Sequence, residues 1–180
     1  KTPMVWRGPM ASGALMQMLQ QTRWGELDYL LIDMPPGTGD IQLTLAQQIP
    51  CTGAVIVTTP QTVALLDAQK GIEMFRKVGI DCLGIVENMA THICSECGRE
   101  EAIFGSGGGA RIAAEYGVRM LGSIPLDAAI CESLDAGKSC VDAAPDTPIA
   151  QRYQRLARAL AREVCARSAV ATPELLISDD

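Results

Sequence analysis

The chain has 180 residues, of which 48% are hydrophobic and 20% charged, a composition typical of one globular domain rather than of a disordered chain. A formal net charge of -6, without Lys/Arg runs interleaved with aromatic residues, makes a nucleic-acid partner unexpected. No apolar stretch approaches the roughly 20 residues that span a bilayer, and residues 1–10 lack the apolar core of a signal peptide, so we expect a cytoplasmic protein without a membrane partner.

The first half of the chain alternates helical and strand patterns. Residues 10–21 place leucine and methionine on one face and predict a helix. The continuous apolar run LDYLLID at 27–33, which ends in an acid followed within two residues by a proline pair, predicts a buried parallel strand. A helix over 41–48, a strand over 53–59 and a long helix over 62–78 are predicted next.

The second half repeats this alternation around one irregular segment. A strand is predicted over 82–88, and residues 89–109 then turn polar and glycine-rich, which indicates an excursion from the core. A helix over 110–116, a short strand over 118–126 and a helix over 127–136 are predicted after it.

Residues 148–167 complete the pattern as a final helix, and we expect residues 168–180 to form a frayed tail. Leu, Ile, Val, Ala and Met in separate short runs, with only 4% aromatic residues, are typical of helices layered on a buried sheet. The sequence therefore predicts an α/β fold, a mostly parallel sheet flanked by helices, in one domain over 1–167.

The motif LLIDMPPGTGD at 30–40 places an acid where a predicted buried strand ends. Ligands bind at that edge of an open α/β sheet. Asp33 could bind Mg²⁺ directly or through water, and the Gly37 amide, with no side chain beside it, could approach a γ-phosphate. An aspartate-capped turn without a ligand is the alternative, and the local pattern alone leaves both open.

Cysteine usage sets one pair apart from the rest. Seven cysteines, an odd number without framework spacing, argue against a secreted disulfide scaffold, and we expect reduced thiols. Cys94 and Cys97 form a C-x-x-C pair in the polar excursion, where two thiolates can chelate one soft metal ion or cluster. Because two ligands are half a site, we predict a homodimer in which each chain contributes a pair about a two-fold axis.

Two alternatives to a metal site remain for this pair: a redox dithiol, or two loop cysteines without a shared role. A thioredoxin-like dithiol opens a helix directly after a strand, whereas this pair lies several residues beyond Asn88, which favours the metal or cluster. His92 is the single histidine of the chain, and we leave it out of the predicted ligand set because a lone loop histidine is more often solvated.

With these residues in view, the chain resembles the Mrp-type iron-sulfur cluster carrier ATPases of the MinD/ParA group of P-loop NTPases. The resemblance extends to about residue 165 and is carried by MVWRGPMASGALMQML, WGELDYLLIDMPPGTGDIQLTLAQ, GAVIVTTPQTVALLDAQKGIEMF, LGIVENM, HICSECG and IFGSGGG. It implies a MinD-like P-loop fold and an ATP hydrolase that binds a [4Fe-4S] cluster between two subunits, through Cys94 and Cys97, and transfers it to apo-proteins.

The resemblance also implies roles for residues that would contact ATP and Mg²⁺. Asp33 is similar in position to the Walker B acid, and Asn88 to the residue that contacts the adenine edge. The segment Pro35, Pro36 and Gly37 is similar to switch II. The turn containing Pro125 and Asp127 is expected beside the base.

The sequence departs from the family pattern in one respect, because its 180 residues contain no G-K-G-G-x-G-K-[ST] loop. That loop supplies most of the cradle for the β- and γ-phosphates. We therefore expect an N-terminally truncated P-loop domain that does not hydrolyse ATP by itself. Two other functions stay open: a non-catalytic metal-binding dimer scaffold, and a partition or septum-positioning ATPase of the same superfamily.

Overall fold

The computed structural model describes residues 8–34, 37, 39–49, 51–94 and 96–168. Its helices are α1 (Gly8–Gln21), α2 (Asp40–Gln48), α3 (Thr62–Lys77), α4 (Gly108–Tyr116), α5 (Ala128–Asp135), α6 (Cys140–Ala143) and α7 (Pro148–Ser168). Its strands are β1 (Ala54–Thr58), β2 (Cys82–Glu87), β3 (His92–Ile93), β4 (Glu100–Glu101) and β5 (Met120–Ser123). No helix within these ranges is long and apolar enough to cross a membrane.

A parallel three-stranded sheet in the order β1-β2-β5 forms the centre of the fold. Every residue of β2 is buried, because this strand has a neighbour on each side and helices on both faces. The prediction of a parallel sheet flanked by helices is thus confirmed. The predicted strands at 53–59, 82–88 and 118–126 and the predicted helices match the observed elements to within a few residues.

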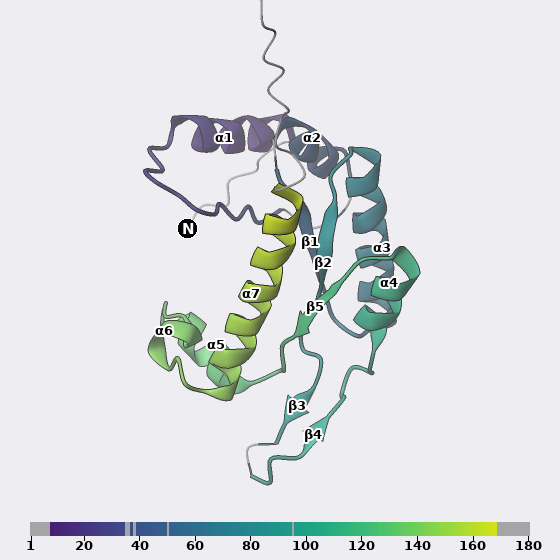
Figure 1. Cartoon of the computed structure of the whole chain (residues 1–180), viewed down its shortest axis with the longest axis vertical. Coiled ribbons are helices and arrows are strands. Elements are labelled where there is room, and N and C mark those ends of the chain that lie inside the picture. The colour runs from purple at the N-terminus through teal and green to yellow at the C-terminus, as the bar shows by residue number, and fades with distance from the viewer. Residues whose placement is uncertain (1–7, 35–36, 38, 50, 95, 169–180) are drawn as a thin grey trace, which may run out of the picture.

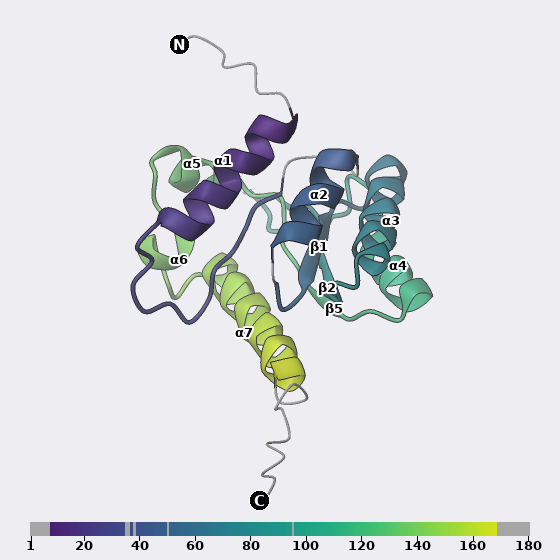
Figure 2. The same ribbon diagram turned by 90° about the horizontal axis from the view of Figure 1, so that it is seen from above.

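Helices α3 and α4 cover one face of the sheet (Figures 1 and 2). Their apolar sides meet alternate residues of the strands, such as Ile56 of β1 and Ile85 of β2, and enclose the fully buried Ile72 and Ile112. The amphipathic spacing of α3 is the reason that the sequence predicts this helix correctly.

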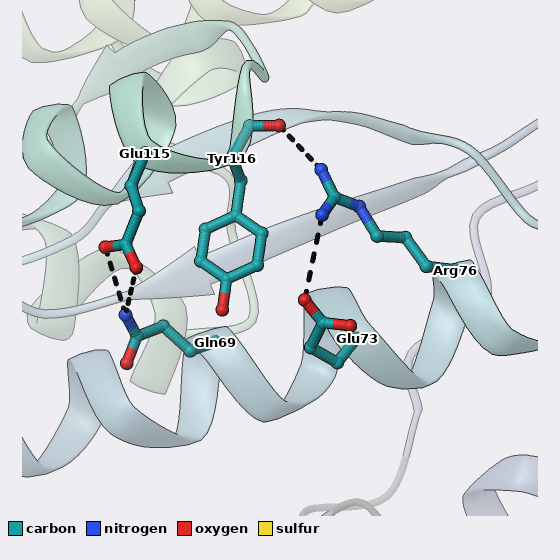
Figure 3. A network of polar contacts seen from close by, with 5 residues as sticks. All are labelled: Gln69, Glu73, Arg76, Glu115 and Tyr116. Atoms are coloured by element: carbon teal, nitrogen blue, oxygen red, sulfur yellow. Dashed lines mark hydrogen bonds and ion pairs between the residues drawn. The ribbon is translucent and has the colours of Figure 1, made fainter.

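Polar contacts link the exposed sides of these two helices (Figure 3). Gln69 donates to the carboxylate of Glu115, and Arg76 donates to the Tyr116 carbonyl at 2.6 Å while its guanidinium lies 4.9 Å from the centre of the Tyr116 ring. Arg76 also pairs with Glu73 at 3.6 Å. These contacts hold the C-terminal end of α4 against α3.

The opposite face of the sheet packs against α7. Val86 and Leu121 contribute the sheet side of this second cluster, and Leu156 and Leu160 lie among the helix residues that pack on it. Two ion pairs reinforce the contact, Arg119 with Glu163 at 2.5 Å and Arg167 with Asp81 at 2.9 Å. Each strand therefore places alternate side chains in two separate clusters.

The predicted strand at 27–33 is wrong, because these residues form no strand. Leu27, Tyr29, Leu30 and Leu31 are exposed, Leu31 to 83%. A strand needs a neighbour to pair its backbone N–H and C=O groups, and within the described ranges nothing pairs with this segment. Apolar composition alone does not supply that neighbour.

Two small features were absent from the sequence prediction. The polar excursion contains an antiparallel hairpin, in which β3 pairs with β4 and which projects from the sheet in Figure 1. The short helix α6 begins after Ser139, whose side chain accepts a hydrogen bond from the Val141 amide. The predicted frayed tail lies outside the described residues, apart from Ser168.

Candidate functional site

A cavity of about 480 Å³ runs beside β1. Its walls come from four parts of the chain: the outer edge of β1, one side of α3, the segment around α2, and the residue that follows β2. Among its lining residues are apolar ones (Val55, Val57, Ala68, Met74, Phe75) and polar ones (Gln42, Thr58, Thr59, Asp67, Asn88). A mostly apolar cavity with a few polar groups is the ordinary form of a small-molecule site.

Two of the residues predicted to contact nucleotide, Gly37 and Asn88, line this cavity. Gly37 has a φ of 101°, a conformation that favours glycine, and its exposed backbone carries no Cβ. Asp33 is exposed and is not among the described lining residues. Pro35 and Pro36, predicted to form switch II with Gly37, lie outside the described residues.

Asn88 lies at the carboxyl end of β2, where the chain leaves the sheet. Its backbone amide donates to the Thr58 carbonyl at 2.7 Å, and this bond joins the ends of β1 and β2. Its side-chain Oδ1 accepts from the Met89 amide at 3.0 Å. Met89 has a φ of 51°, an uncommon value for a residue of this type. This sharp turn directs the chain into the excursion that carries the cysteine pair.

Pro125 and Asp127, predicted beside the base, make contacts within the fold. Pro125 is fully buried. The Asp127 carboxylate accepts from the Ala129 amide at 2.8 Å and caps the N-terminus of α5. Neither residue is among the described lining residues of the cavity. Their placement beside a nucleotide stays a prediction.

Cys94 and Cys97 lie in the tight turn that connects β3 to β4. The Cys94 amide donates to the Arg99 carbonyl at 2.9 Å, and the Gly98 amide donates back to the Cys94 carbonyl at 2.9 Å. These two bonds fold the C-x-x-C segment so that both cysteines belong to one turn at the tip of the projecting hairpin. Cys97 is exposed and Cys94 is half-buried.

The turn favours a thiolate at Cys94. Its pKa is lowered from the ordinary value by the backbone N–H of Cys97, then by the backbone N–H of Glu96, and then by the Cys97 thiol. Thiolates are the form in which cysteine binds soft metals and iron-sulfur clusters. Backbone donors around a ligating sulfur also tune a bound centre.

His92, which we left out of the ligand set, is a residue of β3. Its backbone pairs with Glu101 across the hairpin and forms a parallel bridge to Leu126. Within the described ranges, no group of three or more His, Cys, Asp or Glu side chains is arranged to hold a metal ion. The Cys94 and Cys97 thiols lie within hydrogen-bond reach of each other.

The base of the hairpin is held by α7. Glu100 of β4 accepts from the Thr91 hydroxyl at 2.5 Å and pairs with Arg152 of α7 at 3.6 Å. The Leu126 amide donates to the Thr91 carbonyl at 2.7 Å. The turn with the cysteines is thus exposed at its tip and anchored to the core at its base.

Sequence reasoning missed Glu87, the last residue of β2. This carboxylate is buried and accepts from the Gly109 amide at 2.6 Å. An acid at the end of an apolar run, directly before Asn88, is a pattern that can be recognised in the sequence. Its partner is 22 residues further along the chain, and no local pattern identifies it.

Comparison with known proteins relates this fold and site to others. Residues 1–161 match the ParA family described as "NUBPL iron-transfer P-loop NTPase". The chain is 65% identical over 156 residues to the iron-sulfur cluster carrier protein of Pseudomonas fragi, a match that covers 87% of this chain and 54% of the relative. It is 58% identical over 161 residues to the Escherichia coli K12 protein of the same name, covering 89% and 44%. The chain thus spans about half the length of these relatives.

Solved structures support the same fold. An Archaeoglobus fulgidus nucleotide-binding protein in complex with ADP matches with a TM-score of 0.65 and 42% identity, over 71% of this chain and 52% of that one. The cell division ATPase MinD of Pyrococcus furiosus matches with a TM-score of 0.60 and 23% identity, over 87% of this chain and 59% of that one. The predicted MinD-like fold is confirmed.

Proposed function

We propose that this chain, which belongs to the ParA family of NUBPL iron-transfer P-loop NTPases, acts as an ATP-dependent carrier that binds an iron-sulfur cluster and transfers it to apo-proteins. Cys94 and Cys97 hold the cluster, which is cargo rather than a resident cofactor. The relatives named iron-sulfur cluster carrier protein, one of them 65% identical to this chain, support this proposal.

The observation that carries the proposal is the turn between β3 and β4. It combines two thiols, a lowered Cys94 pKa and an exposed tip. An exposed site suits a carrier, since cargo that is to be handed over must be within reach of an accepting protein. A deeply buried cluster would suit a permanent structural centre instead.

We propose that a [4Fe-4S] cluster is held between two copies of the chain. Such a cluster takes four thiolates, and each chain contributes two from one turn. A two-fold axis through the cluster would bring the tips of two hairpins together. Because the hairpin projects from the sheet (Figure 1), two tips can meet before the cores of the protomers touch.

The nucleotide residues belong to the same proposal. The exposed Asp33 carboxylate offers the hard oxygen ligand that Mg²⁺ prefers, and the Gly37 amide would approach the γ-phosphate. Pro35 and Pro36 would move with Gly37 as switch II, and Asn88 would contact the adenine edge. The metal would neutralise charge on the phosphates.

Iron and sulfide content tests the cluster site. The chain and its Cys94→Ser, Cys97→Ser variant are reconstituted anaerobically with ferrous iron and sulfide, and Cys131→Ser, which removes an exposed cysteine outside the hairpin, serves as the control. We expect about one [4Fe-4S] cluster for two wild-type or control chains, and an almost complete loss in the double variant. Equal iron and sulfide in all three proteins would refute the site.

Titration with ATP and Mg²⁺ tests the nucleotide part separately. We expect no ATP turnover by the 180 residues alone, because their sequence contains no phosphate-cradling G-K-G-G-x-G-K-[ST] loop. In a relative of about twice this length, we expect that ATP changes the rate of cluster transfer. Cluster transfer that is indifferent to nucleotide in that protein would favour the non-catalytic scaffold.

A further inference from the structure

Glu87 is a carboxylate in an unusual position, at the end of the central strand and only 6% exposed. Burying a carboxylate is costly unless hydrogen bonds compensate for its lost hydration. The compensation here comes from the Gly109 amide at 2.6 Å. That amide belongs to the first turn of α4, where the helix dipole favours a negative charge.

The first turn of α4 is shaped for this contact. A Cβ on Gly109 would lie 3.0 Å from Glu87 Oε2, and a Cβ on Gly108 would lie 2.6 Å from Leu65 Cδ1 and 3.1 Å from the Pro60 carbonyl. Two consecutive residues without side chains let α4 approach both the end of β2 and the turn after β1. Gly107, the N-cap residue, has no side chain that could cap the helix. Glu87, which lies on β2, therefore accepts from one of the free backbone amides in the first turn of α4.

This contact joins the two ends of the segment that carries the cysteine pair. The outgoing end is fixed by backbone bonds, from the Asn88 amide to the Thr58 carbonyl at 2.7 Å and from the Ala90 amide to the Ile124 carbonyl at 3.0 Å. The returning end meets the same strand terminus at Glu87. The two ends of residues 88–109 therefore meet at the carboxyl end of β2, and the Glu87 carboxylate is the side chain that bonds the returning end there.

We propose that Glu87 is a positioning residue for Cys94 and Cys97: by accepting from the Gly109 amide it closes the base of the loop and fixes the thiols relative to Asn88 and the sheet. This inference rests on the proposed function, since the thiols must hold a cluster for their position to matter. Glu87 contacts neither cluster nor nucleotide in this role, and it acts through the backbone of α4.

Two substitutions of Glu87 distinguish the role of its hydrogen-bond acceptor from that of its side-chain volume, because both replacements are similar in size to glutamate. Glu87→Gln keeps an oxygen that can accept from Gly109, whereas Glu87→Met fills much the same volume without one. Glu115→Met is the matched control, because it removes a glutamate of α4 that contacts α3 rather than the loop (Figure 3). Gly109→Ala is a second route to the same effect, since its Cβ would press on the carboxylate.

The first measurement is amide hydrogen exchange of Gly109 and of the hairpin residues in the reduced chain without metal, a readout that does not depend on cluster binding. We expect Glu87→Met and Gly109→Ala to exchange about tenfold faster at these amides, with Glu87→Gln and Glu115→Met close to wild type. Wild-type exchange in both loop variants would overturn the proposal. If Glu87→Met does not fold, Gly109→Ala decides.

The second measurement is the rate at which a chelator removes iron from the reconstituted chain, followed by visible absorbance and circular dichroism. We expect several-fold faster loss from Glu87→Met and near-wild-type loss from Glu87→Gln. Faster exchange with unchanged cluster loss would overturn the positioning role. A wild-type chain that binds no cluster, but in which Glu87→Met still accelerates exchange, would refute the proposed function and leave the closure of the loop supported.

Discussion

Two segments carry most of the residues predicted to meet ligands, and the structure holds them in different ways. Residues 82–109 begin as a completely buried strand and continue into a loop that is bonded to the core at both ends. Residues 27–37 begin as an apolar run of similar composition, yet Leu27, Tyr29, Leu30 and Leu31 are exposed. The difference teaches that an apolar run becomes a strand only where other elements supply its hydrogen-bond partners and its cover.

The same difference applies to the predicted chemistry. In the turn that contains Cys94 and Cys97, backbone donors lower the pKa of Cys94. Around Asp33, no described contact restricts the carboxylate. Of the two predicted site residues that the structure describes in this segment, Asp33 and Gly37, it is Gly37 that lines the cavity beside β1. The environment of the cysteine pair thus comes from its own loop, whereas a site at Asp33 depends on further groups.

The largest expected effect comes from shortening one large apolar side chain in each of these two segments. Ile85 in β2 is fully buried, and Ile85→Ala should lower the free energy of unfolding by about 2–5 kcal/mol through lost burial and a new cavity. Leu31→Ala, at an exposed position, should change it by less than about 0.5 kcal/mol. Urea denaturation of both variants measures this. Equal losses would mean that residues 27–33 are buried in solution, and the contrast would be broken.

The second expected effect concerns two thiols within residues 82–109. Burial raises the pKa of Cys82, whereas backbone N–H groups of Cys97 and Glu96 lower that of Cys94. A lowered pKa means that the thiolate persists to lower pH, so iodoacetamide should modify Cys94 at pH 7 about tenfold faster than Cys82, or more. The pH midpoint for Cys94 should be the lower one. Mass spectrometry of peptides from the reduced, metal-free chain gives both rates, and a reversed order of midpoints would contradict the thiolate environment.

The third effect separates a structural contact from a predicted ligand contact at Asp127. Asp127→Ala removes the cap of α5 and should cost about 1 kcal/mol, whereas Asp127→Asn keeps an acceptor oxygen and should cost little. Thermal unfolding of the two variants measures this difference. If the same Asp→Asn change alters nucleotide affinity in one of the longer relatives without altering its stability, the residue also acts beside the base.

These contrasts also show which parts of the molecule a sequence can predict. Helix α3 and strand β2 follow from local periodicity and burial, so their bounds agree closely with the prediction. The two-residue strands β3 and β4 are too short to leave a periodic signal. The cysteine pair is recognisable from its spacing, because chelation by two thiolates depends on residues three positions apart.

Contacts between distant residues were not predictable in this way. The apolar run at 27–33 carries every local sign of a buried strand, but strand formation depends on a neighbour that the run does not contain. Glu87 meets Gly109 across 22 positions, and only the folded chain brings the two together. Asp127 was assigned by resemblance to a ligand contact, whereas its position directly before a helix is itself typical of an N-cap.

The smallest expected effect tests how the base of the hairpin is anchored. Arg152→Met keeps most of the side-chain bulk but removes the charge that pairs with Glu100 at 3.6 Å, a partly exposed contact worth about 0.2–1 kcal/mol. We expect exchange of the Cys94 amide, which bonds Arg99, to rise by a few-fold at most, and the difference from wild type to shrink in about 1 M salt because exposed charges are then screened. Lys70→Met, which breaks an ion pair with Asp67 on α3, should leave that amide unchanged. A difference that persists in salt would mean that Arg152 holds the hairpin by packing of its stem rather than by its charge.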